Sequence, residues 1–145
     1  MEIIILQGGN STGKTETLKN FTEQELTPAK GYYPAGLWHQ LGSDYRDFSE
    51  IFNGNCKIGI FTMGDYGRPL IEATDYFEQH GCDIMICACN DRVREQVRLS
   101  NKWKNYNLHT IYKTVDRHHQ DYSNRKDVNS ISQELQNICN RKNTL

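Results

Sequence analysis

The chain has 145 residues, of which 24% are charged, so it has the size of one ordinary domain and can bury a core without disulfide bonds. Its mean hydropathy is −0.75, and no apolar run approaches the roughly 18 residues of a membrane span, so we expect no contact with a membrane. The net charge of −1 is uneven: residues 1–91 hold 6 basic and 13 acidic side chains, and residues 92–145 hold 11 and 5. This asymmetry would suit a basic face for an anionic partner.

The first apolar run, residues 3–6, is too short for a signal peptide and follows Glu2 instead of a basic segment. We therefore expect a cytoplasmic protein. The five cysteines fit that compartment, because their number is odd and Cys87 and Cys89 alternate along an expected strand. We expect reduced, mostly buried thiols. A metal site is the less favoured alternative, because the chain has no Cys-x-x-Cys pair with zinc-ligand spacing.

Residues 1–7 are predicted to form a buried parallel strand, because four consecutive branched apolar residues show no polar alternation. A helix is predicted over 13–25. In this helix Leu18, Phe21 and Leu26 are spaced so that they share one side. The chain thus begins with a strand, a short polar loop and a helix.

A β-hairpin is predicted over 47–65, with Asn53-Gly54 as its turn. Asn-Gly is the strongest short hairpin signal, because both central residues of a type I′ turn need positive φ. That register places Glu50 opposite Lys57, which is a favourable cross-strand charge pair. An antiparallel strand should therefore border the sheet.

The rest of the chain alternates helix and strand. The expected elements are a helix over 68–81, a strand over 82–89, a helix over 91–103 with Asp91 as its N-cap, a strand over 108–115 and a helix over 128–140. Such alternation predicts a single α/β domain over 1–145. We expect a three-layer sandwich with a mainly parallel sheet and an antiparallel hairpin strand.

Residues 8–15, Gly-Gly-Asn-Ser-Thr-Gly-Lys-Thr, match the pattern G-x-x-x-x-G-K-[ST] at every fixed position. Gly8 and Gly13 allow turns that a Cβ would forbid, so successive N–H groups can point inward, and the following helix adds its own N–H groups and dipole. Lys14 would contact the β- and γ-phosphates, and the Thr15 hydroxyl would ligate Mg²⁺. The motif predicts a phosphate-binding loop formed by Gly8, Gly9, Asn10, Ser11, Thr12, Gly13, Lys14 and Thr15.

This stretch resembles the Walker A motif of the P-loop NTPase superfamily. The match is specific over residues 8–15, and the surrounding strand, loop and helix extend it more weakly. The resemblance implies binding of a nucleoside triphosphate, with ATP and Mg²⁺ as the expected cofactors, and phosphoryl transfer or hydrolysis. The chain matches no named kinase family.

Proteins of this superfamily need a second carboxylate at the end of another buried strand to hold Mg²⁺. Asp65 follows the predicted hairpin and lies between Gly64 and Gly67, whereas Asp91 follows the next strand. We favour Asp65, because ligands gather at the carboxyl ends of strands and the glycines allow close approach. Thr15 and Asp65 are therefore the expected metal ligands, with Asp91 as the alternative.

Arginines follow the same strand ends. Arg92, Arg94 and Arg98 lie on one predicted helix, where Arg94 and Arg98 share a face. Because cations stabilise the charge that spreads during phosphoryl transfer, Lys14, Asp65 and Arg94 are the candidate catalytic residues. The alternative for the arginines is a solvated helix face. Arg68 is a further candidate.

Two other groups of side chains are less informative. The Gly- and Pro-rich stretch 31–45 has no assigned element, and its rings could stack a nucleobase, although burial at the sheet edge is favoured. These residues are Tyr32, Tyr33, Trp38, His39 and Tyr45. His118 and His119 lie in an expected exposed loop, where adjacent side chains point apart, so a metal site there is disfavoured.

Three functions remain. A small kinase-like phosphotransferase that moves the γ-phosphate of ATP to a nucleotide or metabolite is favoured over an NTP-dependent switch or weak ATPase that acts on a protein partner. Nucleic-acid binding by residues 92–145 is disfavoured, because the local charge excess is modest and no base-stacking motif is present. A Ras-like GTPase is disfavoured as well, because Lys104 occupies the decisive Asp position of the guanine-reading N-K-x-D motif.

Overall fold

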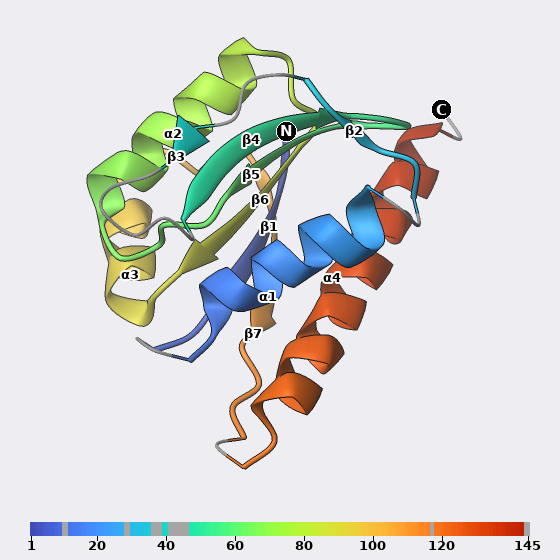
Figure 1. Ribbon diagram of the computed structural model, residues 1–145. Coiled ribbons are helices and arrows are strands. Elements are labelled where there is room, and N and C mark those ends of the chain that lie inside the picture. The colour runs from blue at the N-terminus through green and yellow to red at the C-terminus, as the bar shows by residue number, and fades with distance from the viewer. Residues whose placement is uncertain (10–11, 28–29, 36–38, 41–46, 117, 144–145) are drawn as a thin grey trace.

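The computed structural model describes residues 1–9, 12–27, 30–35, 39–40, 47–116 and 118–143 (Figure 1). Its elements in chain order are β1 (Glu2–Gln7), α1 (Lys14–Asn20), the π-helix η1 (Phe21–Leu26), β2 (Tyr33–Pro34), β3 (His39–Gln40), β4 (Phe48–Asn53), β5 (Lys57–Phe61), α2 (Gly67–Gln79), β6 (Ile84–Cys89), α3 (Asp91–Ser100), β7 (Asn107–Tyr112) and α4 (Gln120–Asn143).

The strands form one mixed sheet in the order β2-β4-β5-β6-β1-β7, and β3 also pairs with β4. The neighbours β5, β6, β1 and β7 are parallel. β4 runs antiparallel to β5, and the two short strands β2 and β3 run antiparallel to β4. The expected α/β class, with a parallel body bordered by an antiparallel hairpin, is confirmed at this level.

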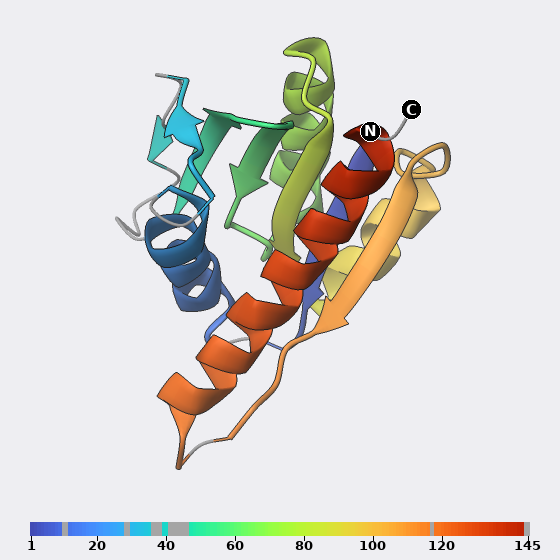
Figure 2. The same ribbon diagram turned by 90° about the vertical axis from the view of Figure 1, so that its right-hand side faces the viewer.

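The middle of the sheet is buried on both faces, because β1 alternates its side chains between two core clusters. Ile4 and Leu6 join the cluster that contains residues of α1, η1 and α4. Ile3 and Ile5 join the cluster that contains residues of α2 and α3. Figures 1 and 2 show α1 and α4 on one side of the strands and α2 and α3 on the other. Two apolar faces explain the four uninterrupted aliphatic residues.

The first helix is continuous over 14–26 but changes type at Phe21. The Thr22 hydroxyl donates to the Leu18 carbonyl, and the Thr27 N–H reaches back five residues to the Thr22 carbonyl. Leu18, Phe21 and Leu26 are fully buried in one cluster, as their spacing predicted.

The last helix, α4, starts eight residues before the predicted position, at Gln120. It therefore includes much of the polar stretch that was expected to be a loop, and its first turns project past the sheet beyond the start of α1 (Figure 2). No helix in the described ranges is both long enough and apolar enough to cross a membrane.

The predicted hairpin is present, but its predicted register is wrong. Asn53 pairs with Lys57 and Glu50 pairs with Ile60, so three residues form the loop and Glu50 does not face Lys57. Gly54 is not among the glycines with positive φ, so the turn is not type I′. The Tyr32 hydroxyl accepts the Cys56 N–H across this loop, and that long-range contact selects the longer connection.

The ends of two other helices follow the predicted chemistry in part. Gly81 has a φ of 74° just after α2, as expected for a helix stop. The N-cap of α3 is Asn90, not Asp91, because the Asn90 side chain accepts the Val93 N–H at 2.7 Å. α3 ends at Ser100, where Asn101 adopts the left-handed conformation. All five cysteines are free and buried, as predicted.

Candidate functional site

The strand connections of β1 and β6 create a crevice at the carboxyl edge of the sheet. β1 continues into α1, which packs in one core cluster, whereas its neighbour β6 continues into α3, which packs in the other. Ligands of open α/β sheets bind where adjacent strands diverge in this way. A cavity of about 550 Å³ lies at this edge, and we call it the loop cavity. Its lining includes Thr12, Lys14, Thr15, Asp47, Thr62 and Asp65.

Lys14 is the first residue of α1 and is only 7% exposed. Its Nζ donates to the carbonyls of Gly8 and Gly9 at 2.9 and 2.6 Å, so the ammonium is enclosed by its own loop. Burial lowers the pKa of Lys14, and the nearby carboxylates of Asp65 and Asp91 oppose that shift. A buried ammonium whose acceptors among the described residues are neutral carbonyls is well placed to exchange them for an anion.

Gly13 connects the loop to α1 with a φ of 90°, a left-handed conformation that favours glycine. A Cβ at this position would lie 2.6 Å from Gln120 Nε2 and 3.0 Å from Asn124 Oδ1. Gln120 Nε2 also donates to the Thr12 carbonyl. The first turns of α4 therefore hold the loop in place, which the sequence did not predict because these turns were assigned to an exposed loop.

Asp47 is the carboxylate that lies beside the predicted metal ligand Thr15. It is 9% exposed, and its Oδ1 accepts hydrogen bonds from the Thr15 hydroxyl at 3.1 Å and the Thr62 hydroxyl at 2.9 Å. Asp47 immediately precedes β4, and because β4 is antiparallel to β5 its start lies at the carboxyl edge of the parallel strands. Asp47 was not predicted as a ligand because it precedes a strand, whereas Asp65 and Asp91 each follow one.

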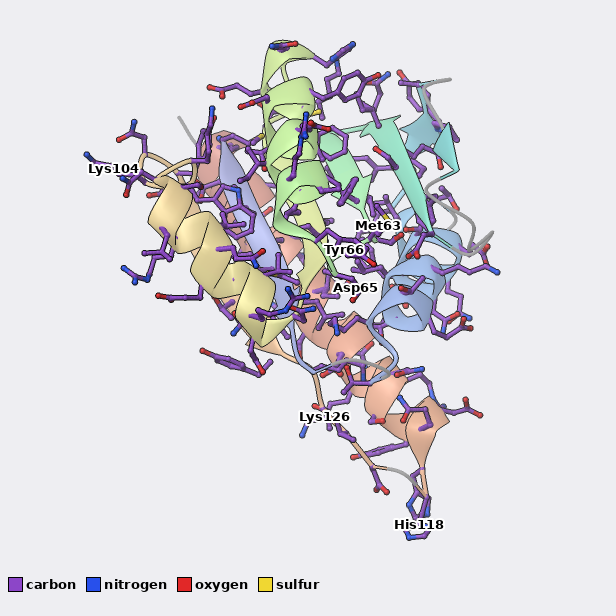
Figure 3. The ribbon with its side chains drawn as sticks, turned by 90° about the vertical axis from the view of Figure 1, so that its left-hand side faces the viewer. Met63, Asp65, Tyr66, Lys104, His118 and Lys126 are labelled. Atoms are coloured by element: carbon purple, nitrogen blue, oxygen red, sulfur yellow. The ribbon has the colours of Figure 1, made fainter. Side chains whose placement is uncertain are left out.

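Asp65 lines the same cavity and is exposed. Figure 3 shows it in the loop after β5, between α1 and α3. Gly64 positions this loop, because a Cβ there would lie 2.2 Å from the Ala88 carbonyl oxygen, and the Gly64 carbonyl accepts the Asn90 N–H at 3.1 Å. The structure thus places Asp65 in the same cavity as Lys14 and Thr15, and its predicted role as a metal ligand stays a prediction.

Other predicted residues lie elsewhere. Asp91 begins α3 and accepts a hydrogen bond from Gln7. Arg94 does not line the loop cavity, because its guanidinium lies over the Trp103 ring at 5.5 Å from the centroid. Arg92 donates to the Asp65 carbonyl at 3.3 Å, and Arg68 pairs with Glu72 on the surface.

The remaining predicted residues have mixed outcomes. Asn10 and Ser11 of the motif, and the aromatic residues Trp38 and Tyr45, lie outside the described residues. Tyr32 is buried in the core, as favoured, whereas Tyr33 is exposed. His118 lies at the far tip before α4, away from the loop cavity (Figure 3).

A buried ion pair lies beside the predicted phosphate-binding loop. Lys113 follows β7, and its ammonium lies 2.9 Å from Asp127 of α4, with side-chain exposures of 0% and 2%. Thr114 donates its N–H and its hydroxyl to the same carboxylate, both at 2.8 Å. Lys113 also lies against Gly8, because a Cβ added at Gly8 would lie 2.8 Å from the Cβ of Lys113. The ion pair and the two hydrogen bonds from Thr114 therefore join the end of β7 to α4 beside the loop.

Among the described residues that line the loop cavity, one is a buried cation and three are carboxylates. Lys14 supplies the positive charge, and Asp47, Asp65 and Glu16 supply the negative charges. A bare polyanion would be repelled by these carboxylates, whereas the charge of a divalent cation bound with the anion would offset theirs.

No protein-family model, no curated protein and no solved structure matches the chain.

Proposed function

We propose that the loop cavity binds a nucleoside triphosphate, ATP in the first instance, together with Mg²⁺, and that the protein transfers the γ-phosphoryl group to a small acceptor. The observation that carries this proposal is the position of Lys14, enclosed by the loop carbonyls in a cavity that also contains Thr15, Asp47 and Asp65. Its volume of about 550 Å³ lies within the usual range for small-molecule sites.

The donor set fits the two expected ligands. Hydroxyl and carboxylate oxygens are the ligands that Mg²⁺ prefers, and Thr15, Asp47 and Asp65 supply them in one cavity. The bound cation would neutralise phosphate charge. Lys14 would bind phosphate oxygens, and the N–H groups at the start of α1 would orient them. The proposal includes the three-layer arrangement, in which the two core clusters lie under helices on opposite sides of the sheet.

A thermal-shift series tests the binding step. The protein is heated with ATP, GTP, ADP or AMP, each with and without Mg²⁺. A ligand at 100 times its Kd stabilises a fold by about 2.7 kcal/mol, which is several degrees for a domain of this size. We expect ATP with Mg²⁺ to stabilise the wild type and Lys14→Ala to lose that response. Lys19→Ala is the matched control, since Lys19 lies on α1 but does not line the loop cavity.

ADP formation then separates transfer from hydrolysis. A phosphotransferase releases ADP only when the acceptor is present, so a library of nucleotides and hydroxylated metabolites should contain compounds that raise the rate. ADP and phosphate formed slowly without any acceptor would support the alternative function, an NTP-dependent switch or weak ATPase. If no nucleotide stabilises the wild type, or if Lys14→Ala responds equally, the proposed site is wrong.

A further inference from the structure

A second cavity lies between α3, the connection that follows it and β7. It has a volume of about 430 Å³, and none of its described lining residues also lines the loop cavity. Val97, Trp103 and Leu108 contribute apolar surface to its lining, and Arg94 and Lys104 contribute cationic groups. We call it the α3 cavity. It combines the two features of a site for an amphiphilic anion, which are apolar walls and positive charge.

Arg94 is the central feature of the α3 cavity. Its guanidinium lies over the Trp103 ring, and its Nη1 is buried with no hydrogen-bond partner within the described part of the chain. A buried donor without an acceptor is destabilising, and more so when it carries charge. Such groups are rare in folded proteins and point to a missing acceptor. Nη1 itself has almost no accessible surface, but Arg94 as a whole is partly exposed and lines the α3 cavity, so an oxyanion bound there would lie beside its side chain.

The acceptors beside the α3 cavity bond to donors other than Arg94. Arg98 is already bound by Glu95 through two hydrogen bonds. The Tyr106 hydroxyl donates to Glu78. The Trp103 indole N–H donates to the Thr74 hydroxyl at 3.0 Å. Glu95, Glu78 and the Thr74 hydroxyl therefore each already accept a hydrogen bond from another side chain.

Lys104 adds positive charge at the rim of the α3 cavity. Figure 3 shows it in the turn beyond the end of α3, with its side chain extending outward. An approaching anion would meet this ammonium first, and its apolar part could then pack against Val97 and Leu108. Of the three cationic residues that line the cavity, Arg98 is bound by Glu95, and Arg94 and Lys104 favour a ligand whose anionic group enters the cavity.

We propose that the α3 cavity binds a small molecule that carries a carboxylate or a phosphate on an apolar body. The guanidinium of Arg94 would donate to the oxyanion, since charge-assisted hydrogen bonds of this kind are short and strong. The apolar body would cover Val97 and Leu108. This site is separate from the proposed phosphoryl-transfer site and does not depend on it.

Three probes of similar size test the proposal: phenyl phosphate, phenylacetate and the uncharged benzyl alcohol. Binding is followed by titration in ¹H–¹⁵N spectra, with the Trp103 indole N–H as reporter. We expect one or both anionic probes to shift this signal with saturation, and benzyl alcohol to bind at least about tenfold more weakly. The anionic probe that binds more tightly identifies the headgroup. Saturating ATP with Mg²⁺ should leave the probe affinity unchanged, because the described linings of the two cavities have no residue in common.

Variants assign the binding to Arg94. We expect Arg94→Met to weaken anionic probe binding at least about tenfold, which corresponds to about 1.4 kcal/mol, and Arg94→Lys to weaken it less. Lys102→Met is the matched control, because Lys102 pairs with Asp75 beside the cavity and does not line it. Lys104→Glu provides a second test at the exposed rim if Arg94→Met is poorly folded, and it should weaken binding as well.

Three outcomes would overturn the proposal. The first is the absence of any saturable shift with either anionic probe. The second is equal binding of benzyl alcohol, which would indicate an apolar cavity without anion recognition. The third is undiminished binding in the folded Arg94→Met or Lys104→Glu variants.

Discussion

The loop cavity and the α3 cavity differ in how their buried cations are satisfied. Beside the loop, the Lys113 ammonium lies 2.9 Å from the Asp127 carboxylate. Within the loop, the Lys14 ammonium donates to two backbone carbonyls. In the α3 cavity, Arg94 Nη1 is buried without a partner in the described ranges. The two ammonium groups at the loop thus have acceptors, whereas one guanidinium donor in the α3 cavity has none among the described residues.

The difference separates a structural charge from a binding charge. Lys113 and Asp127 join β7 to α4 and take part in the fold whether or not a ligand is present. Arg94 contacts an aromatic face, but one of its donors lacks an acceptor among the residues that the structure describes. Removing the partner of a buried charge is strongly destabilising, whereas removing a charge that lacks a partner is not.

The largest expected effect comes from Asp127→Ala. It leaves Lys113 buried without a counter-charge and removes the acceptor of the Thr114 N–H and hydroxyl. We expect the free energy of unfolding, measured by urea denaturation, to fall by about 3–5 kcal/mol. Asp121→Ala, at an exposed position of the same helix, should change it by less than about 0.5 kcal/mol. If Asp127→Ala destabilises the protein no more than Arg94→Met does, the comparison fails.

A medium effect separates the two carboxylates of the loop cavity. Asp47→Ala removes the acceptor of the Thr15 hydroxyl and leaves the Thr62 hydroxyl with its longer bond to the Phe48 carbonyl at 3.3 Å, so we expect a loss of about 1–3 kcal/mol in the nucleotide-free protein. Asp65→Ala, at an exposed position, should cost less than about 0.5 kcal/mol.

Both variants should lose the Mg²⁺-dependent part of the thermal shift with ATP. A normal Mg²⁺ dependence in Asp65→Ala would leave Asp47 as the metal carboxylate. A normal dependence in both variants would contradict the proposed metal site.

The smallest effect concerns Glu50, a carboxylate that the observed register places opposite Ile60 instead of Lys57. Burial raises the pKa of Glu50 above its ordinary value. The folded state therefore holds this proton more tightly than the unfolded state, and Glu50 lowers stability as pH rises through that window.

We expect Glu50→Gln to be more stable than the wild type at pH 7 and equally stable below about pH 4.5. Thermal denaturation of both proteins over a span of roughly 3–4 pH units, from about pH 3.5 to about pH 7, measures the difference in stability. Glu23→Gln, on an exposed position of η1, should show no such trend. A Glu50→Gln variant that is less stable than the wild type at pH 7 would indicate that Glu50 has a stabilising partner.

Local chemistry made several features predictable. The four aliphatic residues of β1 predicted a strand buried on both faces, and Leu18, Phe21 and Leu26 predicted the buried side of the first helix. The spacing from Gly8 to Thr15 indicated the loop, because the motif lies within one short segment. Asp65 lines the same cavity as Lys14 and Thr15 because the ends of parallel strands share one edge, and its role as a metal ligand stays a prediction.

Features that depend on distant contacts were missed. Asn53-Gly54 predicted a two-residue turn, but Tyr32 binds the Cys56 N–H and a longer loop results. The start of α4 was not predicted because its first residues are polar, and their partners are Thr12, Thr17 and Thr114 from other parts of the chain. Arg94 was expected near phosphate, yet the α3 helix turns its guanidinium to Trp103.

The sequence by itself determined the α/β class, the order of its main elements and the position of the loop, because these follow from periodicity and short-range spacing. The tertiary structure alone decided which carboxylate lies beside Thr15, which cation is paired and which is not. Those outcomes depend on strand order, register and helix packing, which bring together residues such as Thr15 and Asp47 or Lys113 and Asp127. Neither charge pairing nor burial can be assigned until the chain has closed around both partners.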